Sequence, residues 1–197
     1  MFKIQKLNNL VLVLFFLQST TILTSDLVNS TNHIKTIIFG AGCFWSVEKK
    51  FQETFGVIDV ESGYADGANI KPLYKEIIKR ENRFNPDNYA EVVRVTYNNN
   101  KTNLENLLKT FFEMHDPTQE NRQGNDIGVQ YRSVILTSSQ EEIMLSKKIK
   151  NIYQNLLSEK GYGIIKTNIK KLTNFYLAED YHQDYLKKNP NGYCPDN

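Results

Sequence analysis

The chain has few of the residues that build metal centres, with two cysteines and three histidines among its 197 residues. They are widely spaced, so no zinc or iron–sulfur ligand set can be assembled from them, and we expect no metal and no bound cofactor. Lys and Arg together number 24 and Asp and Glu number 22, which leaves a formal net charge of +2. The sequence also lacks a Walker loop, a dinucleotide fingerprint and a basic stripe, which argues against nucleotides and nucleic acid as partners.

The apolar run near the N-terminus is short. Lys3 and Lys6 precede residues 10–17, which are all apolar, and residues 18–21 are polar. A basic start followed by a run too short for a comfortable membrane span is typical of a secretory signal peptide. We therefore predict an exported protein in which residues 1–30 form a signal peptide or an N-terminal anchor and linker. An uncleaved membrane anchor is the alternative, because no clean small-x-small cleavage site follows.

Residues 31–197 contain no internal repeat and no low-complexity linker. The whole chain of 197 residues is 40% hydrophobic and 12% aromatic, which fits a single domain with an ordinary core. Hydrophobic periodicity predicts strands at 35–39, 57–64, 90–97, 131–137 and 164–172, and helices at 44–55, 104–114, 139–159 and 178–188. In the first of these helices Phe44, Val47, Phe51 and Phe55 share one face.

The order of these elements predicts the fold class. Strands and helices alternate, with one strand pair inserted between helices, and this favours an α+β two-layer sandwich. We expect a ferredoxin-like core with a mixed or antiparallel sheet, helices on one side, and a long irregular C-terminal tail.

Cys43 lies where a predicted strand meets a predicted helix, in Gly42-Cys43-Phe44-Trp45. At such a junction the N–H groups of the first helical turn and the helix dipole favour a thiolate. Cys194 lies on a Gly/Pro-containing tail that can bring a second thiol to an oxidised sulfur. Spacing alone leaves two alternatives open: Cys43 is a small buried hydrophobe, or the two cysteines form a structural disulfide.

Seven short motifs follow one another over residues 35–194. They are Gly42-Cys43-Phe44-Trp45, Gly63-Tyr64-Ala65, Ala90-Glu91-Val92-Val93-Arg94-Val95, His115-Asp116-Pro117-Thr118, Asn121-Arg122-Gln123-Gly124-Asn125-Asp126, Gln130-Tyr131-Arg132-Ser133 and Ala178-Glu179-Asp180-Tyr181-His182-Gln183. In this order they resemble the peptide methionine sulfoxide reductase A family, whose chemistry returns methionine sulfoxide to methionine. The resemblance implies a catalytic domain over residues 31–197 that reduces free and protein-bound methionine-S-sulfoxide and is recycled by a thioredoxin-like external reductant.

The resemblance also implies a role for individual residues. Cys43 corresponds to the nucleophile, Glu91 to the proton donor, and Cys194 to the resolving cysteine that forms a disulfide with Cys43. The residues that correspond to the family's substrate-binding side chains are Phe44, Trp45, Tyr74, Asp126 and Tyr131. Among these, the aromatic pair would bind the S-methyl group and Tyr131 the sulfoxide oxygen.

Each of these residues also has an ordinary interpretation. Glu91 alternates with Val92 and by that pattern faces solvent, whereas a proton donor must be desolvated enough to hold its proton near neutrality. Tyr131 and Asp126 suit a strand edge and a turn. The segment 77–88 replaces the family's usual Cys-Ser-Gly-x-Thr-Gly-His link and is longer, so Tyr89 is an alternative to Tyr74.

Two other classes of function stay open at this point. In a thiol hydrolase or acyl transferase, Cys43 would pair with His115 or His182. In a non-enzymatic exported module, Cys43 and Cys194 would only hold the fold together. For the reductase we expect a monomer.

Overall fold

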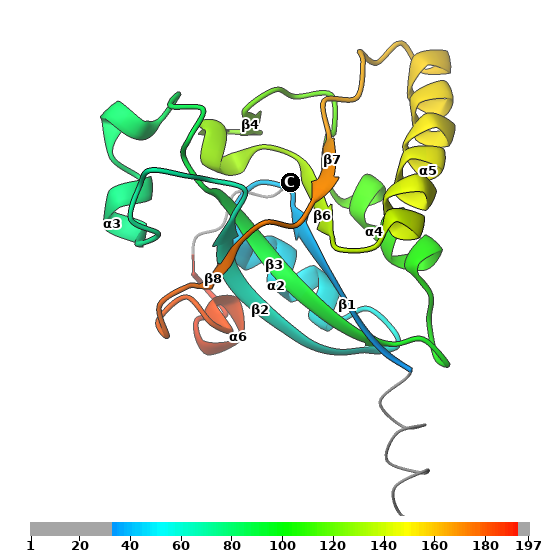
Figure 1. Cartoon of the computed structure of the whole chain (residues 1–197), viewed down its shortest axis with the longest axis horizontal. Helices are drawn as coiled ribbons and strands as arrows, with labels where there is room; N and C mark the ends of the chain where they lie inside the picture. The colour runs from blue at the N-terminus through cyan, green and yellow to red at the C-terminus, as the bar shows by residue number, and fades with distance from the viewer. Residues whose placement is uncertain (1–32, 193–197) are drawn as a thin grey trace, which may run out of the picture. The chain divides into compact units, whose positions relative to one another are not determined.

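Figure 1 shows the chain as a computed structural model, which describes residues 33–192. Its strands are β1 (Ile34–Gly40), β2 (Val57–Ala65), β3 (Ala90–Asn98), β4 (Arg122–Gln123), β5 (Asp126–Ile127), β6 (Val134–Thr137), β7 (Asn168–Lys171) and β8 (Phe175–Leu177). Its α-helices are α2 (Phe44–Gln52), α3 (Tyr74–Ile77), α4 (Leu104–Met114), α5 (Gln140–Glu159) and α6 (Tyr185–Lys188). Two short 3₁₀ helices, η1 (Arg80–Asn82) and η2 (Val129–Tyr131), lie in the connections.

The main sheet has the strand order β7-β6-β1-β3-β2-β8. β1 pairs antiparallel with β6, β2 pairs antiparallel with β3 and β8, and β6 and β7 are parallel. The inner order β6-β1-β3-β2, connected through α2 and α4, is that of a ferredoxin-like unit. The predicted α+β class with a mixed sheet is therefore confirmed.

The three long helices cover one face of this curled sheet (Figure 1). Phe39 of β1 stacks on Phe51 of α2, with ring centroids 4.9 Å apart, and on Phe111 of α4, at 5.0 Å. α5 packs on the same core, since Tyr153 stacks on Phe112 at 5.1 Å. The opposite face buries a smaller cluster over which Leu172 and Phe175 pack. β1 and β3 are thus covered on both sides.

Four predicted elements differ from the structure. The first helix ends at Gln52, so the expectation that Phe55 belongs to its apolar face is wrong, and this ring is 76% exposed. The strand predicted at 131–137 begins only at Val134, because Tyr131 closes a 3₁₀ helix. The last two predicted elements shrink to β7 and α6, and the short strand β8 was not predicted.

The remaining elements agree closely with prediction. Ser139 accepts a hydrogen bond from the backbone N–H of Glu142 and so caps α5, as the sequence suggests. Among the described residues, none of the helices is both long enough and apolar enough to span a bilayer. The predicted signal peptide at residues 1–30 and the predicted resolving residue Cys194 lie outside the described part of the chain.

Candidate active site

Cys43 is the N-cap residue of α2 and is only 7% exposed. The chain reaches it from β1 through Gly42, whose φ of 98° lies in the region that favours glycine. This turn places the thiol at the positive end of the helix, where backbone N–H groups stabilise an anion. The predicted strand-to-helix position of Cys43 is therefore confirmed.

Glu91 of β3 lies at the same helix end. Its Oε2 accepts a hydrogen bond from the backbone N–H of Phe44, the residue after Cys43, at 3.2 Å. The alternation of apolar and polar residues along this strand predicts that Glu91 faces solvent. This prediction is wrong, because Glu91 is only 2% exposed. Both faces of β3 are buried, with Val92 in the smaller cluster and Val93 in the main core. Burial disfavours the charged form of a carboxyl group, and the donated N–H favours it.

Tyr74, Asp126 and Tyr131 line a common cavity of 460 Å³. Burial raises the pKa of Tyr74 to about 12, and the charges of Glu91 and Cys43 act in the same direction. Burial also raises the pKa of Tyr131, with further contributions from Glu91 and Asp126. Tyr74 on α3 and Tyr131 on η2, which the resemblance singled out, thus lie close enough to Cys43, Glu91 and Asp126 on β5 for these charges to raise their pKa values.

An aromatic group lies beside this environment. Trp45 donates its indole N–H to His182 Nδ1 at 3.1 Å and stacks on Tyr185 with centroids 3.8 Å apart. The His182 ring lies 4.9 Å from the Phe44 ring and 4.5 Å from the Tyr74 ring. His182 is 1% exposed, and burial lowers its pKa. A neutral imidazole that accepts at Nδ1 carries its proton at Nε2.

Glu179 connects this aromatic group to the sheet. Its carboxylate accepts hydrogen bonds from the Tyr64 hydroxyl at 2.8 Å and from the Tyr74 backbone N–H at 2.9 Å. Burial acts to raise the pKa of Glu179, but these hydrogen bonds and His182 leave it lowered overall. Glu179 therefore fixes the start of α3 and with it the position of Tyr74.

Tyr89, the alternative to Tyr74, belongs to a different contact. Its ring packs edge-on against Tyr176 at 5.6 Å and is not among the residues that line the cavity of Tyr74. Tyr74 and Tyr89 therefore lie in different places, and of the two it is Tyr74 that lines the cavity.

The histidines do not form the pair that a thiol hydrolase needs. His115 Nδ1 lies 2.7 Å from the Phe111 carbonyl oxygen and its Nε2 lies 2.8 Å from Ser133 Oγ. His182 Nδ1 accepts from Trp45, and its Nε2 lies 3.9 Å from Glu179 Oε2. These contacts leave neither imidazole as a general base for Cys43.

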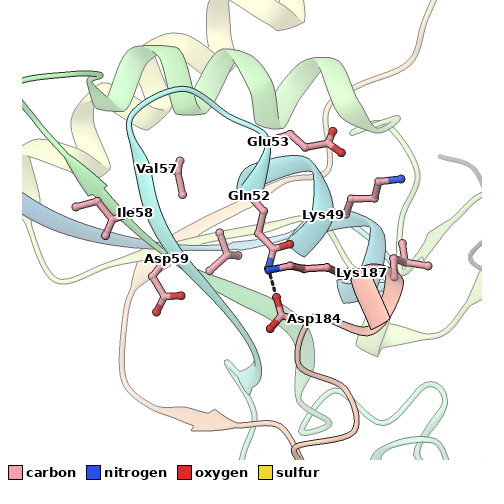
Figure 2. A pocket seen from close by; sticks show the side chains of 10 residues that line it. Lys49, Gln52, Glu53, Val57, Ile58, Asp59, Asp184 and Lys187 are labelled. Carbon is pink, nitrogen blue, oxygen red and sulfur yellow. Dashed lines mark hydrogen bonds between the residues drawn. The ribbon is translucent and has the colours of Figure 1, made fainter. Parts of the chain in front are cut away.

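A second cavity, of 580 Å³, lies between α2, the start of β2 and α6 (Figure 2). No cysteine, histidine or aromatic residue lines it. Within its lining, Gln52 Nε2 donates to Asp184 Oδ1 at 2.8 Å, as Figure 2 shows. Glu48, 2% exposed, lies one turn earlier in α2; burial raises its pKa, and hydrogen bonds from the Asp184 and Tyr185 backbones act against this rise. Together these contacts attach α6 to α2, the helix that Cys43 precedes as its N-cap.

Comparison with known proteins agrees with this geometry. A model of the peptide methionine sulfoxide reductase family matches residues 35–197. The chain belongs to this family. It is 48% identical over 157 residues to the mitochondrial peptide methionine sulfoxide reductase of Homo sapiens, an alignment that covers 80% of this chain and 65% of the human protein. The chain thus spans slightly less than two thirds of that relative's length.

Two solved structures of similar proteins support the fold. Methionine sulfoxide reductase A of Corynebacterium diphtheriae superimposes with a TM-score of 0.76 at 40% identity, covering 83% of this chain and 78% of the bacterial one. Mxr1 of Saccharomyces cerevisiae, in complex with Trx2, superimposes with a TM-score of 0.55 at 25% identity, covering 84% of this chain and 88% of the yeast one.

In this reductase family member the structure brings together most of the predicted site residues. They are Cys43, Phe44, Trp45, Tyr74, Glu91, Asp126 and Tyr131. Sequence reasoning did not place Glu179 or Tyr185 in the site, and it considered His182 only as a base for a hydrolase. The motif that contains Glu179 and His182 was a usable signal for both, whereas nothing near Tyr185 in the sequence marks it.

Proposed function

We propose that this chain is a peptide-methionine (S)-S-oxide reductase, acting on free and protein-bound methionine-S-sulfoxide. The observation that supports this most is the hydrogen bond between Glu91 and the Phe44 N–H, at 3.2 Å. It places a buried carboxyl group, a potential proton donor, next to a cysteine at a helix N-terminus. Those are the two groups that sulfoxide reduction requires.

In the proposed first step the Cys43 thiolate attacks the sulfoxide sulfur, and Glu91 supplies a proton to the oxygen. The oxygen is transferred to Cys43, so methionine leaves and the cysteine becomes a sulfenic acid. Sulfur of the substrate is reduced by two electrons and sulfur of Cys43 is oxidised by two. Tyr74, with a pKa of about 12, keeps its hydroxyl proton at neutral pH and can donate it in a hydrogen bond to the sulfoxide oxygen. Tyr131 has the same capacity, since its pKa is also raised.

The aromatic group supplies the proposed binding site for the S-methyl group. Trp45 is only partly buried and so keeps some apolar surface open to a substrate, and the Phe44 ring, which is 1% exposed, lies beside it with the centroids 6.3 Å apart. Trp45 is held on two sides, by His182 and by Tyr185. Such support keeps a ring in place and lets it bind a small apolar group without a large loss of side-chain freedom.

In the proposed second step the Cys194 thiol attacks the sulfenic acid of Cys43, water leaves, and a disulfide forms. A thioredoxin-like reductant then returns both cysteines to thiols by disulfide exchange. The yeast Mxr1–Trx2 complex supports a thioredoxin as the partner. Oxidised proteins would be the macromolecular substrates.

We also propose that residues 31–197 form one monomeric catalytic domain and that residues 1–30 direct export, with an uncleaved anchor as the alternative. The basic start and the short apolar run support this assignment. N-terminal sequencing of the protein from its native source distinguishes cleavage from anchoring. Light scattering on the purified domain gives its mass and tests the monomer.

The direct test of the proposed activity uses dabsyl-methionine sulfoxide with dithiothreitol as reductant. We expect the S epimer to be reduced and the R epimer to remain unreacted. Equal consumption of both epimers would overturn the stereochemical assignment, and consumption of neither would overturn the proposed function.

A further inference from the structure

The cavity of Tyr74, Asp126 and Tyr131 extends away from these residues along a wall that the reaction itself does not use. Ile78, Arg80 and Arg83 form that wall, and Ile127 lies in the same lining. Arg80 and Arg83 are both exposed. The cavity volume of 460 Å³ lies in the range of sites that hold ligands larger than a single side chain.

Hydrogen bonds hold this wall in one place. The Arg83 carbonyl oxygen accepts from the Val129 N–H at 2.8 Å, and Arg83 Nε donates to the Ile127 carbonyl oxygen at 2.8 Å. The side chain of Asn88, which is buried, donates to the Ile77 and Asn82 carbonyl oxygens, each at 2.9 Å. The segment is therefore built against the η2 region that positions Tyr131.

The wall is cationic. Within residues 33–192, neither Arg80 nor Arg83 forms an ion pair, whereas Lys79, the residue before Arg80, pairs with Glu76 at 2.6 Å. Glu81 is exposed on the same 3₁₀ helix but does not line the cavity. The lining holds one acid, Asp126, whose pKa burial raises, against the two arginines.

We infer that this wall is a subsite for the polypeptide that flanks a methionine sulfoxide and that it favours aspartate or glutamate in those positions. Arg80 and Arg83 would face the carboxylates, and Ile78 and Ile127 would contact the aliphatic parts of the peptide. The inference rests on the proposed function, since it assumes that the oxidised side chain enters between Tyr74 and Tyr131. Complementary charges at the rim of a site mainly speed the encounter with a ligand and strengthen its binding a little. We therefore expect the two arginines to lower KM for acidic peptides.

The experiment compares three peptides that differ only in the residues on either side of methionine-S-sulfoxide: glutamate, serine or lysine. Dithiothreitol serves as reductant, so that docking of a protein reductant does not enter. For the wild type at low salt we expect kcat/KM to be about three- to tenfold higher for the glutamate peptide than for the lysine peptide. Half-molar salt should remove most of this ratio.

The variants test the assignment through the same ratio. In Arg80→Gln/Arg83→Gln it should fall to near one. The control Lys75→Gln/Lys79→Gln removes two positive charges from the same segment outside the cavity lining and should keep the wild-type ratio. Because Arg83 also supports Ile127, Arg80→Glu alone provides a second test, and there the lysine peptide should become the better substrate.

A wild type that reduces all three peptides equally well at low salt would overturn the inference, as would a control that loses the ratio as fully as the arginine variant. Failure of the proposed function gives a different result. In that case the wild type would not reduce N-acetyl-methionine-S-sulfoxide, which has no flanking residues.

Discussion

Replacing Glu91 by glutamine tests the proton donor with little change in shape. In the structure Glu91 Oε2 accepts the Phe44 N–H at 3.2 Å, and the amide oxygen of glutamine can accept the same hydrogen bond. The change therefore preserves the link between β3 and the N-terminus of α2. It removes the acidic proton, which an amide does not supply.

The size of the effect follows from the role. General acid catalysis contributes roughly 10²–10⁴-fold, which corresponds to about 3–5 kcal/mol of transition-state stabilisation. We expect Glu91→Gln to lose kcat by this factor while KM changes little. Unfolding in urea should show a change in stability of about 1 kcal/mol or less, because the buried acceptor stays paired. The assay is reduction of dabsyl-methionine-S-sulfoxide across pH 6–8.

Glu61→Gln is the matched control, since Glu61 lies on the neighbouring strand β2 and pairs with Arg94 at 2.6 Å near the surface. It should keep wild-type turnover. Activity of Glu91→Gln within threefold of wild type throughout this pH range would refute the assignment of Glu91. Loss of activity together with a large loss of stability would instead make Glu91 a residue that holds α2 in place.

Two further changes address the aromatic group and a buried histidine. Trp45→Ala should raise KM far more than it slows alkylation of Cys43 by iodoacetamide; equal slowing of both would mean that Trp45 positions α2 instead of binding substrate. Burial lowers the pKa of His115 from 6.5 to about 4, so between these values the unfolded chain binds a proton that the folded chain does not. Stability should therefore fall by about 2 kcal/mol from pH 7 to pH 5 in urea titrations, and His115→Gln should lose that part of the pH dependence; an unchanged pH dependence in the variant would contradict it.

The sequence correctly predicted the elements whose formation depends on residues close together in the chain. Helix α4 was predicted with its observed bounds, and α5 begins directly after Ser139, whose side chain caps it. Such features depend on residues three or four positions apart. Strand β8 was missed because its three residues are defined by pairing with β2, more than a hundred positions earlier in the chain. No pattern within residues 175–177 reports that contact.

In the site, too, features that depend on neighbouring residues were predicted and features that depend on distant contacts were not. The position of Cys43 follows from a strand, a glycine turn and a helix in sequence, and it was predicted. The burial of Glu91 depends instead on α2 covering one face of β3 and on residues near Phe175 covering the other, so alternation along the strand gave the wrong orientation. The contact between Trp45 and His182 joins residues 137 positions apart, which only the folded chain brings together.

The most direct test of the account is methionine released per enzyme in a rapid-quench experiment without reductant. Cys43→Ser should release none, because the nucleophile is gone. Cys194→Ser should release one equivalent and leave Cys43 as a sulfenic acid, which a small thiol but not thioredoxin then reduces. Methionine released by Cys43→Ser would contradict the proposed nucleophile, and a Cys194→Ser variant without a stoichiometric burst would contradict the two-step mechanism.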